Sequence, residues 1–188
     1  MDLLIQAIEK ISPLPDDCKE AFLSAWQYQE VPKDHMLLRE NTVSDQFFFL
    51  EKGVARIYYH KNEKEVTEWI AMDRQFFLSI TSFFERTPSH LAIHTLEPSQ
   101  LYSIRQADFL RLADQYHAVE KLLRKMVTSS LILSQQRMDS IQFETAQQRY
   151  ERLLEQSPGI IQRVPLSYIA SFLGVTLETL SRIRSHRH

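Results

Sequence analysis

Two side chains near the end of the chain have the types and the spacing needed to read nucleic-acid bases. Glu178 and Arg182 are four residues apart, so in a helix they would share one face. An arginine can donate two hydrogen bonds to a guanine edge, and a glutamate can accept one from a cytosine amine. Hydroxyl groups around this pair suit further contacts to bases or phosphates. They belong to Thr176 and Ser181 on the same face and to Ser167, Tyr168 and Thr179 nearby.

Two short helices joined by a tight turn would have to hold these side chains. Between Leu166 and Arg184, apolar residues recur at the spacing expected for contacts between two crossed helices. Ala170 is small where the helices would approach, Gly174 can end the first helix in the left-handed conformation, and Thr176 can cap the second. The pattern predicts a helix-turn-helix, a unit whose second helix enters the major groove of DNA. The alternative is a tight corner between two core helices that binds no DNA.

The tract Gly-Val-Thr-Leu-Glu-Thr-Leu-Ser-Arg-Ile at residues 174–183 is similar to the recognition-helix signature of the Crp/Fnr superfamily of bacterial transcription regulators. The resemblance extends over nearly the whole chain. It implies a cyclic-nucleotide-binding β-roll, then a long dimerisation helix and a C-terminal helix-turn-helix. It also gives base-reading roles to Glu178 and Arg182. The family often has an arginine just before the glutamate, where this chain has Leu177, and this departure puts the best-known DNA half-site in doubt.

The first 107 residues predict two short helices followed by a β-rich region. Apolar residues fall at helical spacings within residues 1–26, on either side of a proline-containing break at 12–15. Six β-prone runs follow, separated by turn residues such as Gly53: 36–38, 46–50, 54–59, 66–70, 91–96 and 101–104. The expected fold class is α+β, and residues 1–107 are expected to form an antiparallel, jelly-roll-like β-roll flanked by helices.

A long helix is predicted from Asp108 to about Ile141. Its apolar residues form one stripe at Val119, Leu122, Met126 and Leu133, and a second stripe at Leu123, Val127, Leu131 and Met138. We expect the second stripe to pack against another copy of the chain, which makes residues 108–143 a dimerisation helix. The alternative is a helix buried on both sides within one monomer. Residues 144–188 then form the DNA-binding domain, with a helix at 145–156 and a β-hairpin wing reduced to about 160–164.

In the sensor half, the charged residues by which the family holds a cyclic nucleotide are missing. Members that bind nucleotide carry a Gly-Glu pair, whose glutamate holds the ribose hydroxyl, and a later Arg-Ser pair, whose arginine binds the cyclic phosphate. Leu78-Ser79 and Ser89-His90 occupy those places here. A lost charge-assisted hydrogen bond costs about 1.5–3 kcal/mol, so we expect weak or absent cyclic-AMP binding and no cofactor. Replacement of the missing arginine by His90 or Arg86 is the alternative.

Aromatic residues are concentrated in the same region, at Trp69, Phe76, Phe77, Phe83 and Phe84. Either they fill the space that a ligand would have occupied and leave a scaffold of fixed shape, or they line a site for an apolar effector. Trp69 is therefore a candidate pocket residue beside Ser79, Ser89, His90 and Arg86.

Composition narrows the class of protein further. The chain of 188 residues has a single cysteine, Cys18, which excludes an internal disulfide and a Cys-rich iron–sulfur site. We see no signal segment and no apolar run of roughly 18 residues, so we expect a cytoplasmic protein without a membrane span. A net charge of −2 argues against nucleic acid, but the sign is unevenly distributed. Residues 144–188 carry six Lys or Arg against four Asp or Glu and end in the basic stretch 184–188.

Two other classes of function remain as alternatives. Similar β-rolls host cupin-like metal enzymes, but His90 and His94, an even number apart on one predicted strand face, would lie roughly 13 Å from each other. We therefore expect neither catalysis nor a metal. The other alternative is an effector-binding or protein-interaction module without DNA. The expected partners are double-stranded DNA with a palindromic operator, a second copy of the chain and, as a candidate, RNA polymerase.

Overall fold

Eight strands form the centre of the molecule, and the computed structural model describes residues 1–185. The strands are β1 (Gln27–Val31), β2 (Met36–Leu38), β3 (Gln46–Lys52), β4 (Ala55–Lys61), β5 (Lys64–Ala71), β6 (Gln75–Phe77), β7 (Ala92–Thr95) and β8 (Ser99–Arg105). They form two four-stranded antiparallel sheets with the orders β1-β8-β3-β6 and β2-β7-β4-β5. This β-roll is the antiparallel sheet core that the sequence predicts.

The core of the β-roll lies between the two sheets. Phe48 of β3 stacks on Phe77 of β6 with ring centroids 5.1 Å apart, and Leu101 of β8 is fully buried beside them. Burial of such a side chain contributes roughly 1.5–3 kcal/mol, so this layer is a main source of stability. The turn between β3 and β4 needs Gly53, whose φ is +132°, because a Cβ there would lie 2.2 Å from the Ser99 hydroxyl.

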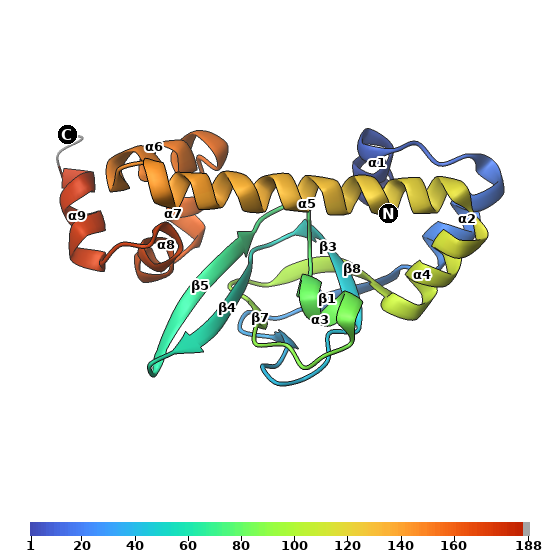
Figure 1. Ribbon diagram of the computed structural model, residues 1–188, viewed down its shortest axis with the longest axis horizontal. Helices are drawn as coiled ribbons and strands as arrows, with labels where there is room; N and C mark the ends of the chain where they lie inside the picture. Colours follow the sequence, from blue (N-terminus) through green and yellow to red (C-terminus); the bar gives the residue numbers. More distant parts are fainter. Residues whose placement is uncertain (186–188) are drawn as a thin grey trace.

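Nine helices within residues 1–185 flank the roll. They are α1 (Asp2–Ile11), α2 (Asp16–Ser24), α3 (Ile80–Glu85), α4 (Gln106–Gln115), α5 (His117–Phe143), α6 (Ala146–Gln156), α7 (Ile160–Arg163), α8 (Leu166–Leu173) and α9 (Leu177–Ser185). Figure 1 shows α5 running along one side of the roll, with α1, α2 and α4 near its beginning and α6 to α9 near its end. None of the helices in this part of the chain is long and apolar enough to cross a membrane.

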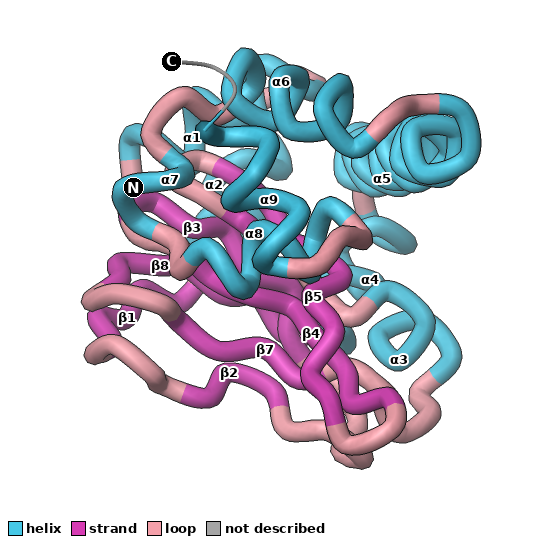
Figure 2. Tube along the Cα trace, turned by 90° about the vertical axis from the view of Figure 1, so that its left-hand side faces the viewer, coloured by secondary structure: helices cyan, strands magenta, loops and turns pink. Residues whose placement is uncertain are grey.

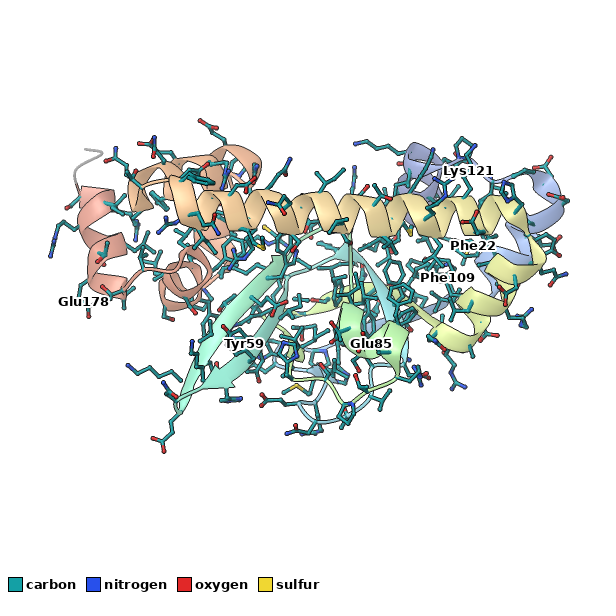
Figure 3. The ribbon with its side chains drawn as sticks, viewed as in Figure 1. Phe22, Tyr59, Glu85, Phe109, Lys121 and Glu178 are labelled. Atoms are coloured by element: carbon teal, nitrogen blue, oxygen red, sulfur yellow. The ribbon has the colours of Figure 1, made fainter. Side chains whose placement is uncertain are left out.

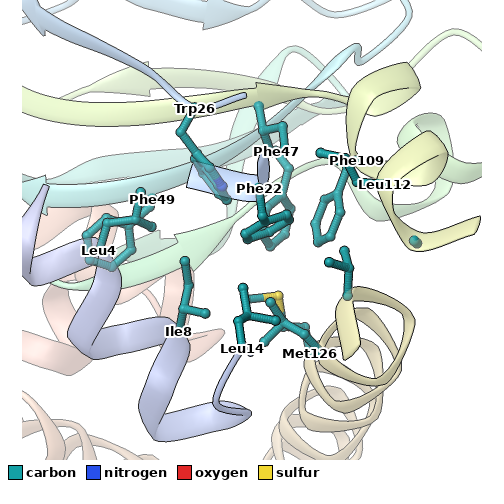
Figure 4. Close-up of a cluster of buried hydrophobic side chains, with 14 of the residues drawn as sticks. Leu4, Ile8, Leu14, Phe22, Trp26, Phe47, Phe49, Phe109, Leu112 and Met126 are labelled. Atoms are coloured by element: carbon teal, nitrogen blue, oxygen red, sulfur yellow. The ribbon is translucent and has the colours of Figure 1, made fainter. Parts of the chain in front are cut away.

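An aromatic cluster joins one sheet to the helices at the beginning of α5 (Figure 4). The ring of Phe109 lies 5.4 Å from that of Phe22 and 5.6 Å from that of Phe47, centroid to centroid. Val119 and Leu122 of α5 are fully buried against this cluster. The first apolar stripe of the predicted long helix therefore packs on the body of the protein over this first part of α5.

The predicted helix from Asp108 to Ile141 is wrong in one respect, because it is two helices. The chain breaks at Tyr116, whose backbone is extended (φ −126°, ψ 112°), and α5 alone covers 27 residues. The break changes the direction of the chain, so that α4 packs on β8 while α5 packs on α1, and α2 contacts both helices. No glycine or proline marks the break, and the sequence pattern therefore does not reveal it.

The C-terminal helices share a hydrophobic core with the outside of the roll. Val54, Ile70 and Leu96 of the roll pack in one buried cluster with residues of the C-terminal helices such as Ile160 and Ile169. Figure 2 shows α8 and α9 in front of β4 and β5, and α8 contacts β5 directly. The two parts of the chain are therefore joined by an apolar contact as well as by α5.

The predicted β-hairpin wing at about 160–164 is also wrong. The segment forms the single helical turn of α7, with Val164 as its C-cap, and the amide of Val164 donates to the carbonyl of Ile160 at 2.9 Å. Ile160 and Val164 are both buried, whereas Gln162 between them is exposed; a helical turn allows this, but an alternating strand would place all three side chains on one face.

Several short elements extend or add to the prediction. The strands β3, β4, β5 and β8 are one to three residues longer than expected at their ends, and the helix predicted at 145–156 is α6 with Thr145 as its N-cap. The strands β1 and β6 and the helix α3 are absent from the prediction. Polar residues dominate β1, at the edge of its sheet, and β6 and α3 are too short for a period to be recognised.

Candidate DNA-contact surface and effector region

The turn between α8 and α9 has the geometry that its residues favour. Gly174 is left-handed (φ 69°, ψ 34°), and the amide of Val175 donates to the carbonyl of Ala170 at 3.0 Å. The hydroxyl of Thr176 then accepts a hydrogen bond from the amide of Thr179 at 3.1 Å, which caps the beginning of α9. These contacts fix the direction of α9 relative to α8.

The face of α9 that points away from the core carries the residues predicted to read bases. Leu177, Glu178, Ser181 and Arg182 are all exposed, whereas Leu180 is fully buried against the other C-terminal helices. Figure 3 shows Glu178 at the end of the molecule, projecting from α9. The arrangement presents a carboxylate and a guanidinium one helical turn apart on an open surface.

Glu178 is held as an anion at the first turn of α9. A hydrogen bond from its own backbone amide and one from the hydroxyl of Thr176 lower the pKa of the Glu178 carboxyl. The position also places the negative charge near the positive end of the helix dipole. The carboxylate is therefore available as an acceptor at neutral pH.

Tyr168 faces the β-roll instead of joining this surface. Its ring lies over the guanidinium of Arg56, 3.7 Å from the carbon atom to the ring centroid. In the same helix, the hydroxyl of Ser171 accepts a hydrogen bond from the amide of Thr67 in β5 at 2.9 Å. Ser167 is exposed. Of the two α8 residues predicted to contact phosphates, the structure thus leaves Ser167 open and packs Tyr168 against the roll.

A cluster of charges ties α7 to the roll. The guanidinium of Arg163 donates two hydrogen bonds to Asp73, from Nη1 to Oδ2 at 2.7 Å and from Nη2 to Oδ1 at 2.9 Å. It also donates from Nε to Oε1 of Glu97 at 3.2 Å and from Nη2 to the carbonyl of Gly53 at 3.0 Å. The hydrogen bonds from Arg163 lower the pKa of the Asp73 carboxyl. The sequence gives no sign of this cluster, because Arg163 is 66 to 110 residues away from its partners.

The two positions at which nucleotide-binding relatives are expected to carry charged ligands contact each other. The hydroxyl oxygens of Ser79 and Ser89 are 2.9 Å apart, and both residues are buried. The Ser89 hydroxyl donates to the carbonyl of Leu91 at 2.9 Å, so the proton between the two serines comes from Ser79. The site is thus satisfied internally by neutral groups.

The remaining effector candidates lie apart from this pair. Arg86 donates to the carbonyl of Ser44 at 3.0 Å and to Asp45 at 2.9 Å, so it holds a loop in place. His90 precedes β7 and its side chain is 70% exposed, with Glu68 4.0 Å away. The prediction that His90 and His94 share a strand face is therefore wrong, because only His94 lies in β7.

Trp69 lines a cavity of about 430 Å³ beneath α5. Phe76, Phe83 and Phe84 line it as well, whereas Phe77 lies between the two sheets. Four of the five aromatic residues singled out in the sequence therefore line a cavity instead of filling the space completely. Its other walls come from α5, from the C-terminal helices and from residues such as Ile11 at the end of α1 and Phe47 of β3.

The second apolar stripe of α5 is largely exposed. Leu131 is 68% exposed, and Val127 and Met138 are also open to solvent, whereas Leu123 packs partly against the cluster at the start of α5. Leu133, the last residue of the first stripe, is 48% exposed and lines the cavity. Large apolar side chains in such a row are an unusual surface for a monomer.

Sequence reasoning missed a buried polar group under α8. Arg56 is fully buried on β4, where its Nε donates to the Thr67 hydroxyl at 2.9 Å and its Nη1 pairs with Glu65. His94 lies next to it, its Nε2 has no hydrogen-bond partner within residues 1–185, and burial lowers its pKa. The sequence does not predict that Arg56 is buried, because the alternation of side chains along a strand places it opposite Ala55 and Ile57, on a face expected to be exposed to solvent.

Titratable side chains do not gather into a metal site in the part of the chain that the structure describes. No group of three or more His, Cys, Asp or Glu residues there could hold an ion. The histidines are scattered: the His60 ring lies near the carboxylates of Glu40 and Glu65, and the His90 ring lies near that of Glu68.

Comparison with known proteins identifies the first part of the chain. Residues 28–116, from β1 to the end of α4, match the family model of the cyclic nucleotide-binding domain. The structure is similar to the c-di-GMP responsive global regulator CLP of Xanthomonas campestris (14% identity, TM-score 0.70, covering 92% of this chain and 91% of that one). It is also similar to FixK2 of Bradyrhizobium japonicum (20% identity, TM-score 0.72, covering 86% of this chain and 83% of that one). A search of curated proteins found no match.

The likeness to regulators extends beyond the sheets, but part of it is shared with another class. The regulatory domain of Toxoplasma gondii PKA, crystallised with cAMP, matches with 12% identity and a TM-score of 0.51, over 59% of this chain and 42% of that one. The chain thus has an antiparallel sheet core with flanking helices like the cyclic nucleotide-binding fold, and its structural neighbours include regulators of the Crp/Fnr type.

Proposed function

We propose that the protein is a sequence-specific, DNA-binding transcription regulator of the Crp/Fnr type that acts in the cytoplasm as a homodimer and is not an enzyme. The observation that carries the proposal is the pair α8 and α9. Gly174 and Thr176 fix their turn, and α9 presents Glu178 and Arg182 on its open face. We assign α9 as the recognition helix of a helix-turn-helix.

A homodimer is required for tight and specific binding. The exposed stripe at Val127, Leu131 and Met138 supports an interface along α5. Two recognition helices related by a two-fold axis would lie about 34–36 Å apart and read a palindromic operator. The small excess of positive charge in residues 144–188 predicts low non-specific affinity, so each subunit alone would bind weakly. RNA polymerase is the candidate partner through which such a regulator would act.

The sensor half is proposed to respond to something other than cyclic AMP. The neutral pair of Ser79 and Ser89 offers no cation to a cyclic phosphate, and both hydroxyls already have partners. Arg86 is occupied by Ser44 and Asp45, and His90 lies on the surface beside Glu68. A phosphate placed at this site would lose its charge-assisted hydrogen bonds.

Selection of bound duplexes from a random pool, followed by gel-shift titration, tests the proposal. We expect a palindrome, and we expect Arg182→Ala to weaken binding to it by about 1–3 kcal/mol. The matched control is Arg111→Ala on α4, which removes the same charge from an exposed pair with Asp108. Failure of the wild type to bind any duplex above its non-specific affinity would refute DNA binding.

A second candidate is an effector-binding or protein-interaction module that does not bind DNA. The likeness of the roll to a kinase regulatory domain favours it, as does the packing of Tyr168 of α8 on Arg56 of the roll. This candidate predicts a folded, dimeric protein that selects no DNA sequence in the same experiment.

A further inference from the structure

Two hollows meet beside α5, and their linings differ in kind. The cavity of about 430 Å³ that contains Trp69 has no charged side chain in its lining. Next to it is an open cleft between the end of α1, the turn before β6 and α5. Ile11, Phe76 and Ser129 line both, so the apolar cavity and the cleft adjoin at these three residues.

The cleft is basic. Its lining contains four cations and two hydroxyl groups and no acidic residue: Lys10, Arg74, Arg124, Lys125, Thr128 and Ser129. Lys125 donates to the carbonyl of Ile11 at 2.9 Å, which holds its ammonium group at the end of α1. Arg124 has one exposed carboxylate neighbour, Glu120, at 3.6 Å. Lys10 and Arg74 form no ion pair with any residue in the range 1–185.

These charges favour an anion at the mouth of the cavity. Among the four cations that line the cleft, only Arg124 forms an ion pair within residues 1–185, so a bound anion would relieve their mutual repulsion, and partial enclosure would strengthen their attraction for it. The neighbouring cavity offers apolar burial of a size typical of small-molecule sites, which run from about 300 to 1,000 Å³. Neither hollow alone defines a ligand, but together they define one with an acidic head and an apolar tail.

We infer that the protein binds a single-chain amphipathic anion, of which a long-chain fatty carboxylate is the simplest member, with its tail in the cavity and its head in the basic cleft. The head would interact with Lys10 and Arg74, the two lining cations that form no ion pair within residues 1–185, and the tail would pass Ser129 toward Trp69. This site differs from the buried pair of Ser79 and Ser89. The inference concerns direct binding and does not depend on the proposed binding of DNA.

A second copy of the chain is the competing occupant of the cavity. Val127 and Phe84, both partly exposed, lie on the side of the cavity that a partner helix could cover. Lys125 and Ser129 lie on the flank of α5 that faces α1. A dimer along the exposed stripe would cover the side of the cavity that carries Val127 and Phe84 and would leave the basic cleft open as the entrance. The ligand and the second copy can therefore both be bound only if the dimer still leaves room in the cavity for the apolar tail.

Isothermal titration calorimetry with three probes tests the inference. Dodecanoate is expected to bind at one site per chain, at least tenfold more tightly than dodecan-1-ol, and acetate is expected to show no binding. Dodecanoate should also change the tryptophan fluorescence of the wild type, and this change should disappear in Trp69→Phe, which keeps Trp26.

Substitutions separate the head site from the tail site. The double substitution Lys10→Ala and Arg74→Ala is expected to reduce the ratio of the dodecanoate affinity to the dodecan-1-ol affinity about tenfold. The control double substitution Lys61→Ala and Lys64→Ala, at the β4–β5 turn, is expected to leave this ratio unchanged. Ser130→Phe, in the cavity wall, is expected to weaken both probes. Thermal melts monitored by circular dichroism check that each variant folds.

Four results would overturn the inference. They are absence of dodecanoate binding to the folded wild type, equal affinities for the acid and the alcohol, an acid preference that survives the loss of Lys10 and Arg74, and binding confined to a monomer. The last result, seen by light scattering, would assign the cavity to a second copy. Each of these outcomes is independent of whether the protein selects a DNA sequence.

Discussion

Removal of the Arg163 side chain tests how firmly the C-terminal helices are attached to the roll. Arg163→Ala deletes the two hydrogen bonds to Asp73, the contacts to Glu97 and the hydrogen bond to the carbonyl of Gly53. It also leaves two carboxylates on the roll without their shared cation. The substitution changes little of the apolar core, so it isolates the charged contacts.

The size of the effect can be worked out from the geometry. Hydrogen bonds to charged groups contribute about 1.5–3 kcal/mol when sheltered, and exposed ion pairs contribute about 0–1 kcal/mol. The Arg163 side chain is 26% exposed and that of Asp73 is 42% exposed, which places the cluster between these limits. We expect Arg163→Ala to lower the free energy of unfolding by about 2 kcal/mol, and the Tm by about 4–8 °C for a chain of this length.

The pH dependence has a defined sign. Arg163 holds the pKa of the Asp73 carboxyl below its unfolded value of about 3.9, so the pairing stabilises the fold above that value. The stabilisation is lost as the pH falls from there through the folded pKa. Urea titrations of the wild type and the variant should therefore differ most at neutral pH, and their difference should shrink below about pH 4.

Two other variants make the result interpretable. Arg163→Lys keeps the charge but cannot form the two-pronged contact, so an intermediate loss is expected. Arg111→Ala breaks an exposed pair with Asp108 and should cost less than about 1 kcal/mol. If Arg163→Ala unfolds at the same urea concentration as the wild type, or if the loss is unchanged down to pH 3, the cluster does not hold the C-terminal helices on the roll.

Three further predictions concern single residues. Gly174→Ala should lower the free energy of unfolding in urea by about 1–2 kcal/mol, because the backbone φ is +69° although an added Cβ would meet no other atom. The control Gly159→Ala, at φ −86°, should be neutral or slightly stabilising, and equal effects of the two substitutions would contradict the left-handed turn. Leu131→Glu should abolish the dimer seen by light scattering with little change in helix content. Ile132→Glu, on another face of α5, should leave the dimer intact, and a Leu131→Glu variant that stays dimeric would exclude this interface. The pKa of His94 is lowered by burial, so the wild type should lose stability as the pH falls below about 6.5, and His94→Asn should lose less; identical pH profiles would contradict the buried, neutral imidazole.

The sequence predicts the order of elements well because the apolar period is strong where elements are long. The two N-terminal helices, six of the strands and the pair α8 and α9 follow from spacing and from cap residues such as Gly174 and Thr176. The break at Tyr116 and the helical turn of α7 do not, since each depends on which neighbours the segment packs against.

The candidate site is predictable only where its residues are close in sequence. Glu178 and Arg182 lie on one exposed face because they are one helical turn apart. The basic cleft brings together Lys10, Arg74 and Arg124 from three separate elements, and no pattern along the chain connects them. The position of Tyr168 against the buried Arg56 is likewise a tertiary contact, so the expected phosphate contact could not anticipate it.

The core that Val54, Ile70 and Leu96 share with the C-terminal helices limits how modular this protein is. A chain cut after α5 would expose these three side chains to water and would leave α6 to α9 without the surface that buries Ile160. Each half therefore contributes to the cooperativity of the other, and unfolding is expected as one transition. Exchange of the last 45 residues with those of a distant relative would succeed only if the recipient carried a matching apolar patch on the outside of its own roll.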